Sequence, residues 1–399
     1  MKILIVSQYF YPENLRINDL VFSLKKRGHY VEVLTGKPNY PNGDYFEGYS
    51  WKSPNEELID EIKINRVNLI LRKRGGGFNL FLNYISFVIS GCFRLIDIDK
   101  KFDKVFIYAP SPITVGIIGI LAARKFKCKS YLWVHDLWPE SVKFAGGIKS
   151  SLILKPIDIM TRVIYKYSDK ILIQSPLFKN YLKKQEVDLN KIEYYPYYAE
   201  EYYTQVNCKK EIESKFPKGF NLLFAGNIGR AQNLDTIVST IEKLKFFDIN
   251  VIILGDGRDK KRIQELIKEK NIESKFYFLG VFKPEEMAYF FACADALLIT
   301  LKKADIFSYT IPGKLQSYLA CGKPIIGALD GIGKKIILES GAGYCTKAED
   351  IEGLKNNILK IFNLTQKNRK IFGENGIRYF NENFNKNKLI EKLEYLLNN

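Results

Sequence analysis

Short apolar runs separated by helical patterns recur along almost the whole chain. They lie at residues 2–7, 30–34, 105–108, 131–134, 170–174 and 191–195 in the first half, and at 221–225, 250–254, 275–279, 296–301, 324–327 and 343–345 in the second. Apolar runs without alternating polarity are typical of parallel strands, because helices cover both faces of a parallel sheet. The sequence therefore predicts an α/β protein with two doubly wound parallel sheets in tandem.

The boundary between the halves is predicted at residues 194–203, which read Tyr-Tyr-Pro-Tyr-Tyr-Ala-Glu-Glu-Tyr-Tyr and show no clear periodicity. We interpret them as a linker between a first domain over 1–195 and a second over 204–378. Open parallel sheets bind ligands at the carboxyl ends of their strands. Residues that directly follow a strand are therefore the candidates for a site.

Residues 308–324 follow one such strand and combine helix signals with a positive charge. Pro312 and Gly313 open a helical pattern that Gly322 closes. The free amides and the positive dipole end of a first helical turn attract anions, and Lys314 adds a full charge. We expect this stretch to bind a diphosphate. The alternative is an ordinary buried helix.

Two glycine-containing turns follow other strands of the second half. Residues 226–234 read Gly-Asn-Ile-Gly-Arg-Ala-Gln-Asn-Leu, and residues 254–257 read Leu-Gly-Asp-Gly. Glycine lets a backbone approach a phosphate closely, and Arg230 can bind two phosphate oxygens at once. Both turns are candidates for the same anion site, although a plain tight turn explains 254–257 equally well.

In the first half, the string Trp-Val-His-Asp-Leu-Trp-Pro-Glu at 133–140 lies at the carboxyl end of a strand. A histidine or carboxylate there can remove a proton from an acceptor hydroxyl or organise a leaving group. Asp136 is the acid/base candidate, and Glu140 is the other candidate carboxylate. The alternative is that Asp136 caps the following helix and His135 packs in the core.

These strings resemble those of family 4 glycosyltransferases. Residues 312–324 are similar to Pro-x-Lys-Leu-x-x-Tyr-x-Ala-x-Gly-x-Pro, and residues 226–234 to Gly-Asn-x-Gly-x-x-Gln-Asn/Gly-Leu. Residues 134–141 are similar to the Val-x-Asp-Leu-Trp-Pro-Glu-Ser string of the fucosamine-type amino-sugar transferases of O-antigen and capsule assembly. The resemblance implies the GT-B fold, in which two Rossmann-like domains face a cleft, and retention of anomeric configuration. It also implies that the last helix, 379–399, packs back on the first domain.

The resemblance further implies which residues bind the donor. His135 would contact the donor sugar, and Val281 and Phe282 would lie beside the nucleobase. The full set expected to bind the donor is Gly226, Asn227, Gly229, Arg230, Gln232, Gly255, Val281, Phe282, Pro312, Gly313, Lys314, Leu315, Gln316 and Ser317.

The chain departs from the family pattern where its members carry charge. Many members place an Arg and a Lys on the diphosphate at the positions of Asn227 and Gln232, so we expect Arg230 and Lys314 to supply the charge here. The paired glutamates of the wider family align with Tyr309 and Ser317. The ribose would then be held by Gln316 or Ser317, or more loosely.

Composition limits the partners. Lys and Arg number 61 against 44 Asp and Glu, a net charge of +17 that favours phosphorylated substrates, anionic lipids or nucleic acid. No string resembles a nucleic-acid module, so nucleic acid is not expected. Six scattered cysteines and two histidines indicate a reducing compartment and no zinc site. The Asp-Ile-Asp string at 97–99 reads as a solvated turn, and we expect no metal or cofactor.

Residues 75–93 carry no charge and lie between Arg72-Lys73-Arg74 and Arg94. Asn79, Asn83, Ser86 and Ser90 recur at helical spacing opposite apolar residues, which predicts an amphipathic helix rather than a membrane span. This helix either packs on a neighbour or docks, through 72–94, on an anionic membrane surface. The long loop 36–53 either contacts the acceptor or is a mobile surface loop.

The expected function is transfer of a sugar, in particular an N-acetylated deoxy-amino sugar, from a UDP-linked donor to a polyprenyl-diphosphate-linked saccharide. With no signal peptide in the sequence, the expected location is the cytoplasm, peripherally on the inner face of the cell membrane. The alternative function is a non-hydrolysing sugar-nucleotide 2-epimerase of the same fold.

Overall fold

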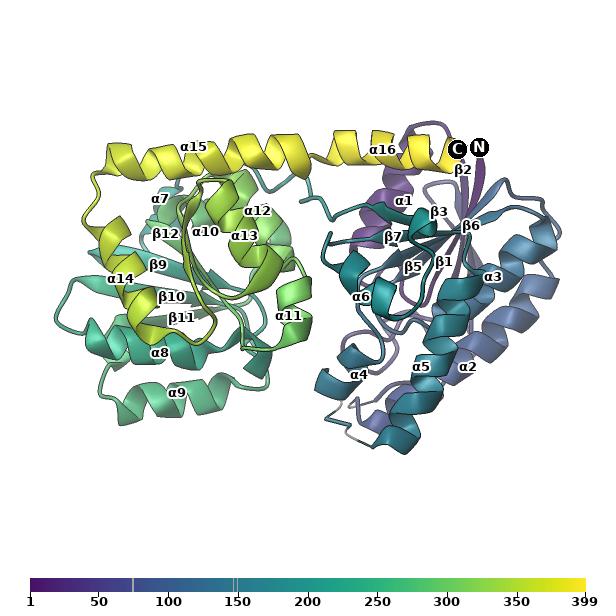
Figure 1. Ribbon diagram of the computed structural model, residues 1–399, viewed down its shortest axis with the longest axis horizontal. Helices are drawn as coiled ribbons and strands as arrows, with labels where there is room; N and C mark the ends of the chain where they lie inside the picture. Colours follow the sequence, from purple (N-terminus) through teal and green to yellow (C-terminus); the bar gives the residue numbers. More distant parts are fainter. Residues whose placement is uncertain (74, 146, 149) are drawn as a thin grey trace. The chain divides into compact units, whose positions relative to one another are not determined.

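The computed structural model describes residues 1–73, 75–145, 147–148 and 150–399, so Arg74 of the predicted basic flank lies outside the described residues. The chain divides into two compact units (Figure 1). The N-terminal unit comprises Met1–Pro196 together with Ile390–Asn399, and the C-terminal unit comprises Tyr197–Leu389.

The N-terminal unit contains an eight-stranded sheet in the order β3-β4-β2-β1-β5-β6-β7-β8. Every neighbouring pair is parallel except β3 with β4. The strands are β1 (Lys2–Ser7), β2 (Tyr30–Gly36), β3 (Glu56–Ile59), β4 (Ile62–Val67), β5 (Lys104–Ala109), β6 (Lys129–Val134), β7 (Lys170–Ile173) and β8 (Ile192–Tyr194). The central strands β1, β5 and β6 are buried apart from their first residues, as the continuous apolar runs predicted.

Helices cover both faces of this sheet. They are α1 (Arg16–Lys26), α2 (Gly77–Ile96), α3 (Val115–Phe126), α4 (Glu140–Ala145), α5 (Ser151–Tyr167) and α6 (Phe178–Lys184). The helices α2, α3 and α5 form a row on one face, and α1 lies on the other (Figure 1). Within the row the helices approach closely at Gly91 and Gly116, where a Cβ atom would meet Ile118 and Ile164 respectively.

The C-terminal unit contains a six-stranded parallel sheet in the order β11-β10-β9-β12-β13-β14, the doubly wound arrangement of nucleotide-binding folds. Its strands are β9 (Phe220–Ala225), β10 (Ile249–Leu254), β11 (Phe276–Gly280), β12 (Ala296–Thr300), β13 (Ile325–Ala328) and β14 (Gly343–Thr346). All six strands predicted in this half are found, and the prediction of two doubly wound α/β units is confirmed.

The helices of this unit are α7 (Lys210–Glu213), α8 (Leu234–Lys243), α9 (Lys260–Glu269), α10 (Met287–Cys293), α11 (Asp305–Tyr309), α12 (Gly313–Cys321), α13 (Gly331–Glu339), α14 (Ile351–Phe362) and α15 (Gln366–Asn383). The last helix, α16 (Lys386–Asn398), begins in this unit and continues into the N-terminal unit. Short 3-10 turns occupy Leu189–Lys191, Arg230–Gln232, Glu273–Lys275 and Pro284–Glu286. One sheet face is covered by α8, α9 and α14, and the other by α10, α12 and α13 (Figure 1).

Several details differ from the sequence predictions. The single C-terminal helix over 379–399 is two helices, because α15 ends at Asn383 and α16 begins at Lys386. Only Ile390–Asn399 groups with the N-terminal unit, where Glu394 binds Arg27 at 3.0 Å and His29 at 2.8 Å. The second unit therefore extends to Leu389, and it begins at Tyr197 instead of residue 204.

The remaining two differences concern strands and cysteines. The hairpin of β3 and β4 was not predicted, because its sequence is rich in charge and β3 is an exposed edge strand. Cys208 and Cys293 form a disulfide that joins the segment before α7 to the end of α10. The cysteine spacing did not predict this bond.

Candidate active site

The predicted anion site lies at the carboxyl edge of the C-terminal sheet. The helix α12 begins at Gly313 after the N-cap Pro312 and ends at Gly322, which has a positive φ of 65°. The Lys314 ammonium donates a 2.7 Å hydrogen bond to Oε1 of Gln232 and lies 3.9 Å from the centre of the Phe224 ring. The two predicted phosphate-binding strings are thus in direct contact.

Lys314 is held without a counter-charge. In the part of the chain that the structure describes, no carboxylate lies within ion-pair distance of its ammonium, and burial lowers the pKa of Lys314 to about 7. A desolvated cation is costly unless an anion or several hydrogen bonds satisfy it. The local electrostatics therefore favour an anionic ligand beside Lys314.

The glycine turns shape the space next to this lysine. A Cβ atom on Gly226 would lie 3.3 Å from the Lys314 Nζ atom, and a Cβ atom on Gly255 would lie 2.0 Å from the Gly226 carbonyl oxygen. Both glycines have φ near +135°. The turns are tied by hydrogen bonds from Gly226 N to Leu254 O (2.9 Å) and from Ile228 N to Asp256 O (2.8 Å). Only glycine allows this approach, and it leaves backbone open to a ligand.

Arg230, predicted to share the diphosphate with Lys314, is exposed and lines a shallow cavity of about 290 Å³. The other lining residues are Asn233, Asp235, Arg262 and Lys302. Arg262 is neutralised there by Asp235 at 2.6 Å and by Asp259 at 2.7 Å. Arg230 thus belongs to the same loop as Gln232 but does not contact Lys314.

The other predicted donor residues fall into two groups. Leu315, Gln316 and Ser317 are buried in α12, and the Gln316 amide, in the orientation that suits its neighbours, lies 3.1 Å from the carbonyl oxygens of Pro312 and Gly313. These side chains stabilise the position of the helix and do not face its N-terminal end. By contrast, Asn227 and Val281 are exposed at the carboxyl edge, Gly229 is partly exposed there, and Phe282 packs on Phe290 with ring centres 4.3 Å apart.

The acid/base candidates lie at the carboxyl edge of the N-terminal sheet, directly after β6. Burial raises the pKa of Asp136 to about 7. Among the described residues its carboxylate accepts no hydrogen bond, so it does not cap α4. Buried His135 has its pKa lowered well below 6.5 by burial and by the nearby charge of Arg16. Glu140, at the start of α4, forms an ion pair of 3.7 Å with Lys143. Of these three candidates, Asp136 is the one whose pKa is raised to near neutral pH.

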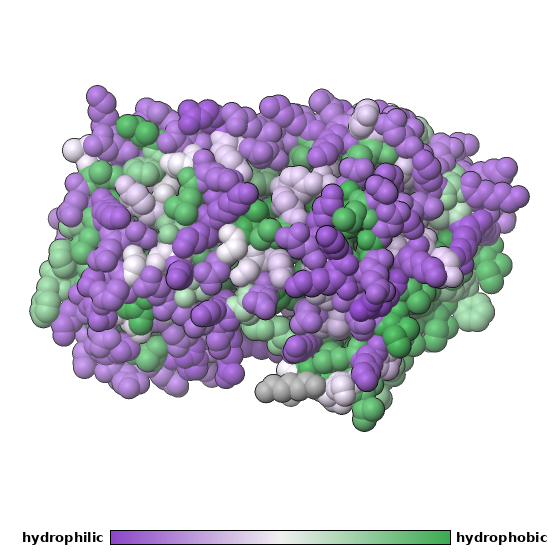
Figure 2. Space-filling model, viewed as in Figure 1, coloured by the Kyte–Doolittle hydropathy of each residue, from purple (hydrophilic) through white to green (hydrophobic). Residues whose placement is uncertain are grey.

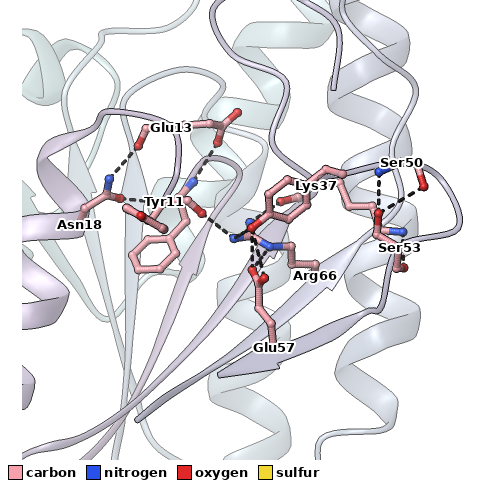
Figure 3. Close-up of polar contacts among 11 residues, drawn as sticks. Tyr11, Glu13, Asn18, Lys37, Ser50, Ser53, Glu57 and Arg66 are labelled. Carbon is pink, nitrogen blue, oxygen red and sulfur yellow. Dashed lines mark hydrogen bonds and ion pairs between the residues drawn. The ribbon is translucent and has the colours of Figure 1, made fainter. Parts of the chain in front are cut away.

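The long loop 36–53 is anchored by a network of charged residues that the sequence did not predict (Figure 3). The buried Lys37 ammonium donates to the carbonyl oxygens of Trp51 (2.7 Å) and Ser53 (2.8 Å). The Glu13 carboxylate accepts from the backbone amides of Phe10, Asn39 and Tyr40 at 2.7–2.9 Å. Arg66, from β4, binds Glu57 and the carbonyl oxygen of Tyr11. These contacts fix the loop to the edge of the sheet. In the sequence, the charged residues that make them could not be told apart from ordinary polar residues of a loop.

The helix α2 buries the polar Asn83 together with Phe87 and Leu95, and it leaves other apolar side chains exposed. Asn83 is fully buried and binds Gln8 at 2.7 Å and the Ile70 carbonyl at 2.6 Å, and the Ser86 hydroxyl accepts from Ile70 N at 2.8 Å. The apolar side chains left exposed on α2 are Phe78 (73 %), Phe81 (57 %), Ile89 (52 %), Phe93 (68 %) and Ile96 (66 %). Hydrophobic residues gather along the outer side of α2 and α5 (Figure 2). Among the described residues, α2 is also the one helix long and apolar enough to cross a membrane.

The fold and the lysine-bearing sheet edge define a class of protein. The chain aligns with sucrose-phosphate synthase from Thermosynechococcus elongatus at a TM-score of 0.79 and 16 % identity, covering 99 % of this chain and 98 % of that one. It aligns with Anabaena HepE in complex with UDP at a TM-score of 0.71 and 12 % identity, covering all of both chains. At these identities the likeness shows the fold alone, which is GT-B.

The sequence comparisons give the family of the C-terminal unit. Residues 207–379 match the family of glycosyl transferases group 1. Over 406 residues the chain is 22 % identical to the glycosyl transferase WcaI of Escherichia coli K12, named for colanic acid biosynthesis, covering 95 % of this chain and 98 % of WcaI. Residues 207–379 thus match a glycosyl transferases group 1 domain, and the chain has the GT-B fold that the resemblance in the sequence implied.

Proposed function

We propose that this glycosyltransferase moves a sugar from a UDP-linked donor to a saccharide carried on polyprenyl diphosphate, with retention of anomeric configuration. The proposal rests on the Lys314 ammonium, which has no carboxylate partner among the described residues. It lies in the first turn of α12, beside the Gly226 turn of a group 1 domain. UDP is the proposed nucleotide because HepE, of the same fold, is described in complex with UDP.

The leaving diphosphate is stabilised by positive groups of the C-terminal unit. Lys314 and the positive end of the α12 dipole oppose its developing charge, as preorganised positive groups do in other transfer reactions. Arg230 is the second proposed cation. With these groups in place we expect no metal requirement, and transfer rates should be the same with and without EDTA.

Asp136 is proposed as the acid/base residue, with His135 as a neutral donor or acceptor to the transferred sugar. A carboxyl with a pKa of about 7 is half ionised at neutral pH and can accept the acceptor's hydroxyl proton. Glu140 is the less suited carboxylate because it is already paired with Lys143.

The acceptor class is proposed from the exposed apolar side of α2. Its exposed apolar side and the exposed basic residue Lys73 before its first turn suit the boundary of an anionic bilayer, where a polyprenyl-linked substrate resides. We propose peripheral attachment through 72–94 to the inner face of the cell membrane. Since WcaI is named for colanic acid biosynthesis, O-antigen, capsule or exopolysaccharide assembly is the proposed process, and an N-acetylated deoxy-amino sugar the proposed cargo.

The decisive experiment is a screen of UDP-, GDP- and dTDP-sugars, N-acetylated deoxy-amino sugars included, against polyprenyl-diphosphate-linked saccharides. Transfer from a UDP-sugar with retained configuration supports the proposal. Turnover of the donor to its 2-epimer without any acceptor would identify the alternative epimerase instead. Transfer only to water-soluble acceptors would remove the lipid-linked part of the proposal.

A further inference from the structure

Three loops at the carboxyl edge of the N-terminal sheet bring an arginine and two tyrosines together. Tyr9 follows β1, Tyr40 follows β2 and Arg72 follows β4. The guanidinium carbon of Arg72 lies 4.9 Å from the centre of the Tyr40 ring and 6.0 Å from that of Tyr9. The two rings are themselves 5.2 Å apart. Arg72 is therefore stacked on an aromatic platform.

The guanidinium of Arg72 has unused hydrogen-bonding capacity. Its polar contact is a 3.4 Å bond from Nη1 to the Tyr9 hydroxyl, and in the described parts of the chain no carboxylate lies within ion-pair distance of it. A guanidinium offers five N–H donors in a planar fork that matches the oxygens of a phosphate. A half-buried arginine with aromatic neighbours and no counter-charge is suited to an anionic ligand.

The platform is held in place before any ligand arrives. Glu13 accepts hydrogen bonds from Phe10 N, Asn39 N and Tyr40 N, which locks the loop after β1 to the loop after β2. On the other side, the Ile70 amide and carbonyl are bound by Ser86 and Asn83 of α2, which fixes the segment that leads to Arg72. A preorganised site loses little entropy on binding.

The platform also lies next to the acid/base candidate within the same unit. Tyr84 of α2 interacts electrostatically with both Arg72 and Asp136, and its ring centre is 6.2 Å from that of Trp138. Arg72 directly precedes the segment that leads into α2, whose outer side is apolar. An anion bound by Arg72 would thus lie between the proposed membrane side and the proposed catalytic carboxyl.

Building on the proposed function, we propose that Arg72, stacked on Tyr9 and Tyr40, binds the diphosphate of the polyprenyl-linked acceptor. This assigns the acceptor's charged group to the N-terminal unit, separate from the donor diphosphate assigned to Lys314. The lipid chain then follows the apolar side of α2, and the saccharide extends toward Asp136.

Binding of farnesyl diphosphate to the whole chain tests this, because farnesyl diphosphate carries the charged group and a short prenyl tail. The titration is made with saturating UDP present, so that the Lys314 site is occupied. Farnesyl monophosphate, farnesol and inorganic diphosphate are titrated in parallel to separate the contributions of charge and tail. The variants are Arg72→Ala, Arg72→Lys and the control Lys101→Ala, which removes an exposed charge beyond the far end of α2.

We expect Arg72→Ala to weaken farnesyl diphosphate binding roughly 10- to 100-fold, as for the loss of a charge-assisted contact, and to leave farnesol binding unchanged. Arg72→Lys should show an intermediate loss because it lacks the planar fork, and Lys101→Ala should bind as wild type does. Inorganic diphosphate bound as tightly as farnesyl diphosphate would overturn the assignment to a lipid-linked acceptor. Wild-type affinity in Arg72→Ala would overturn the site itself.

This test is independent of turnover. If Arg72 governs farnesyl diphosphate binding but no polyprenyl-linked saccharide is glycosylated, the binding site stands and the proposed reaction fails. If transfer occurs with unchanged KM for the acceptor in Arg72→Ala, the reaction stands and the site fails. Unchanged unfolding midpoints in both Arg72 variants confirm that the fold is retained.

Discussion

The Lys314 ammonium is bound by the side-chain oxygen of Gln232 at 2.7 Å, and the partner is an amide, not a carboxylate. An amide fixes the position of the lysine without cancelling its charge. The ammonium therefore keeps its full attraction for an anion, although burial lowers its pKa to about 7. The predictions for the donor site follow from this pair.

Replacing Lys314 by Ala should weaken UDP binding roughly 10- to 100-fold, because a charge-assisted contact to the diphosphate is worth about 1.5–3 kcal/mol. Uridine, which lacks the diphosphate, should bind both proteins equally. Isothermal titration of UDP and uridine measures both effects. Equal UDP affinities in the two proteins would mean that the diphosphate does not contact Lys314.

The dependence of kcat/KM for the donor on pH should be bell-shaped with both limbs near pH 7. Activity falls at low pH as Asp136, with its raised pKa of about 7, takes up a proton, and it falls at high pH as Lys314 loses one. Bound diphosphate raises the pKa of Lys314, so the alkaline limb of kcat should move to higher pH. A flat profile between pH 6 and 8 would contradict both assignments.

Asp136→Asn should abolish transfer, leave UDP affinity unchanged and stabilise the protein. Burial raises the pKa of Asp136 in the folded state, so its ionisation opposes folding as pH rises from about 4 to about 7 and above. Asparagine removes this cost, which is roughly 4 kcal/mol at pH 8, since the pKa is raised from 3.8 to about 7 and each pKa unit is worth about 1.4 kcal/mol. Urea unfolding at pH 5 and pH 8 should show a larger gain at pH 8; an equal gain at both would contradict the raised pKa.

Gly255→Ala should destabilise the C-terminal unit by about 1–3 kcal/mol, because the new Cβ atom would lie 2.0 Å from the Gly226 carbonyl oxygen at a φ of +135°. Gly76→Ala is the matched control, since its Cβ atom meets no atom within 4 Å. Thermal unfolding compares the two. A wild-type midpoint in Gly255→Ala would show that the turns can separate.

Phe81→Ser should reduce flotation with vesicles that contain phosphatidylglycerol, without loss of stability, because its side chain is 57 % exposed in the free protein and leaves water when α2 binds a membrane. Phe246→Ser is the control, since this phenylalanine is 90 % exposed in the C-terminal unit. If both variants float as the wild type does, α2 does not attach the protein.

The strand pattern and the helix α12 of the C-terminal unit could be predicted because their signals are local. Apolar runs gave each strand within one or two residues, and Pro312 and Gly322 marked the ends of α12. The burial that displaces Gln316 from the site could not be predicted, because it depends on the rotation of α12 against the sheet.

The cluster of Tyr9, Tyr40 and Arg72 could not be predicted, because its members are far apart in sequence and meet only through the strand order β4-β2-β1. If β4 had been recognised in the sequence, Tyr9, Tyr40 and Arg72 would all have been identified as residues that follow parallel strands. The amphipathic pattern of α2 was predicted correctly. The side of the helix that faces the protein was not predicted, because periodicity alone does not identify it.

The hydrogen bonds of Asn83 and Ser86 fix the rotation of α2 about its own axis. The chain therefore cannot hide Phe81 and Ile89 by turning the helix, and purified material should self-associate as its concentration rises unless an amphiphile is added. Crystals grown without detergent are expected to pair two molecules along this helix.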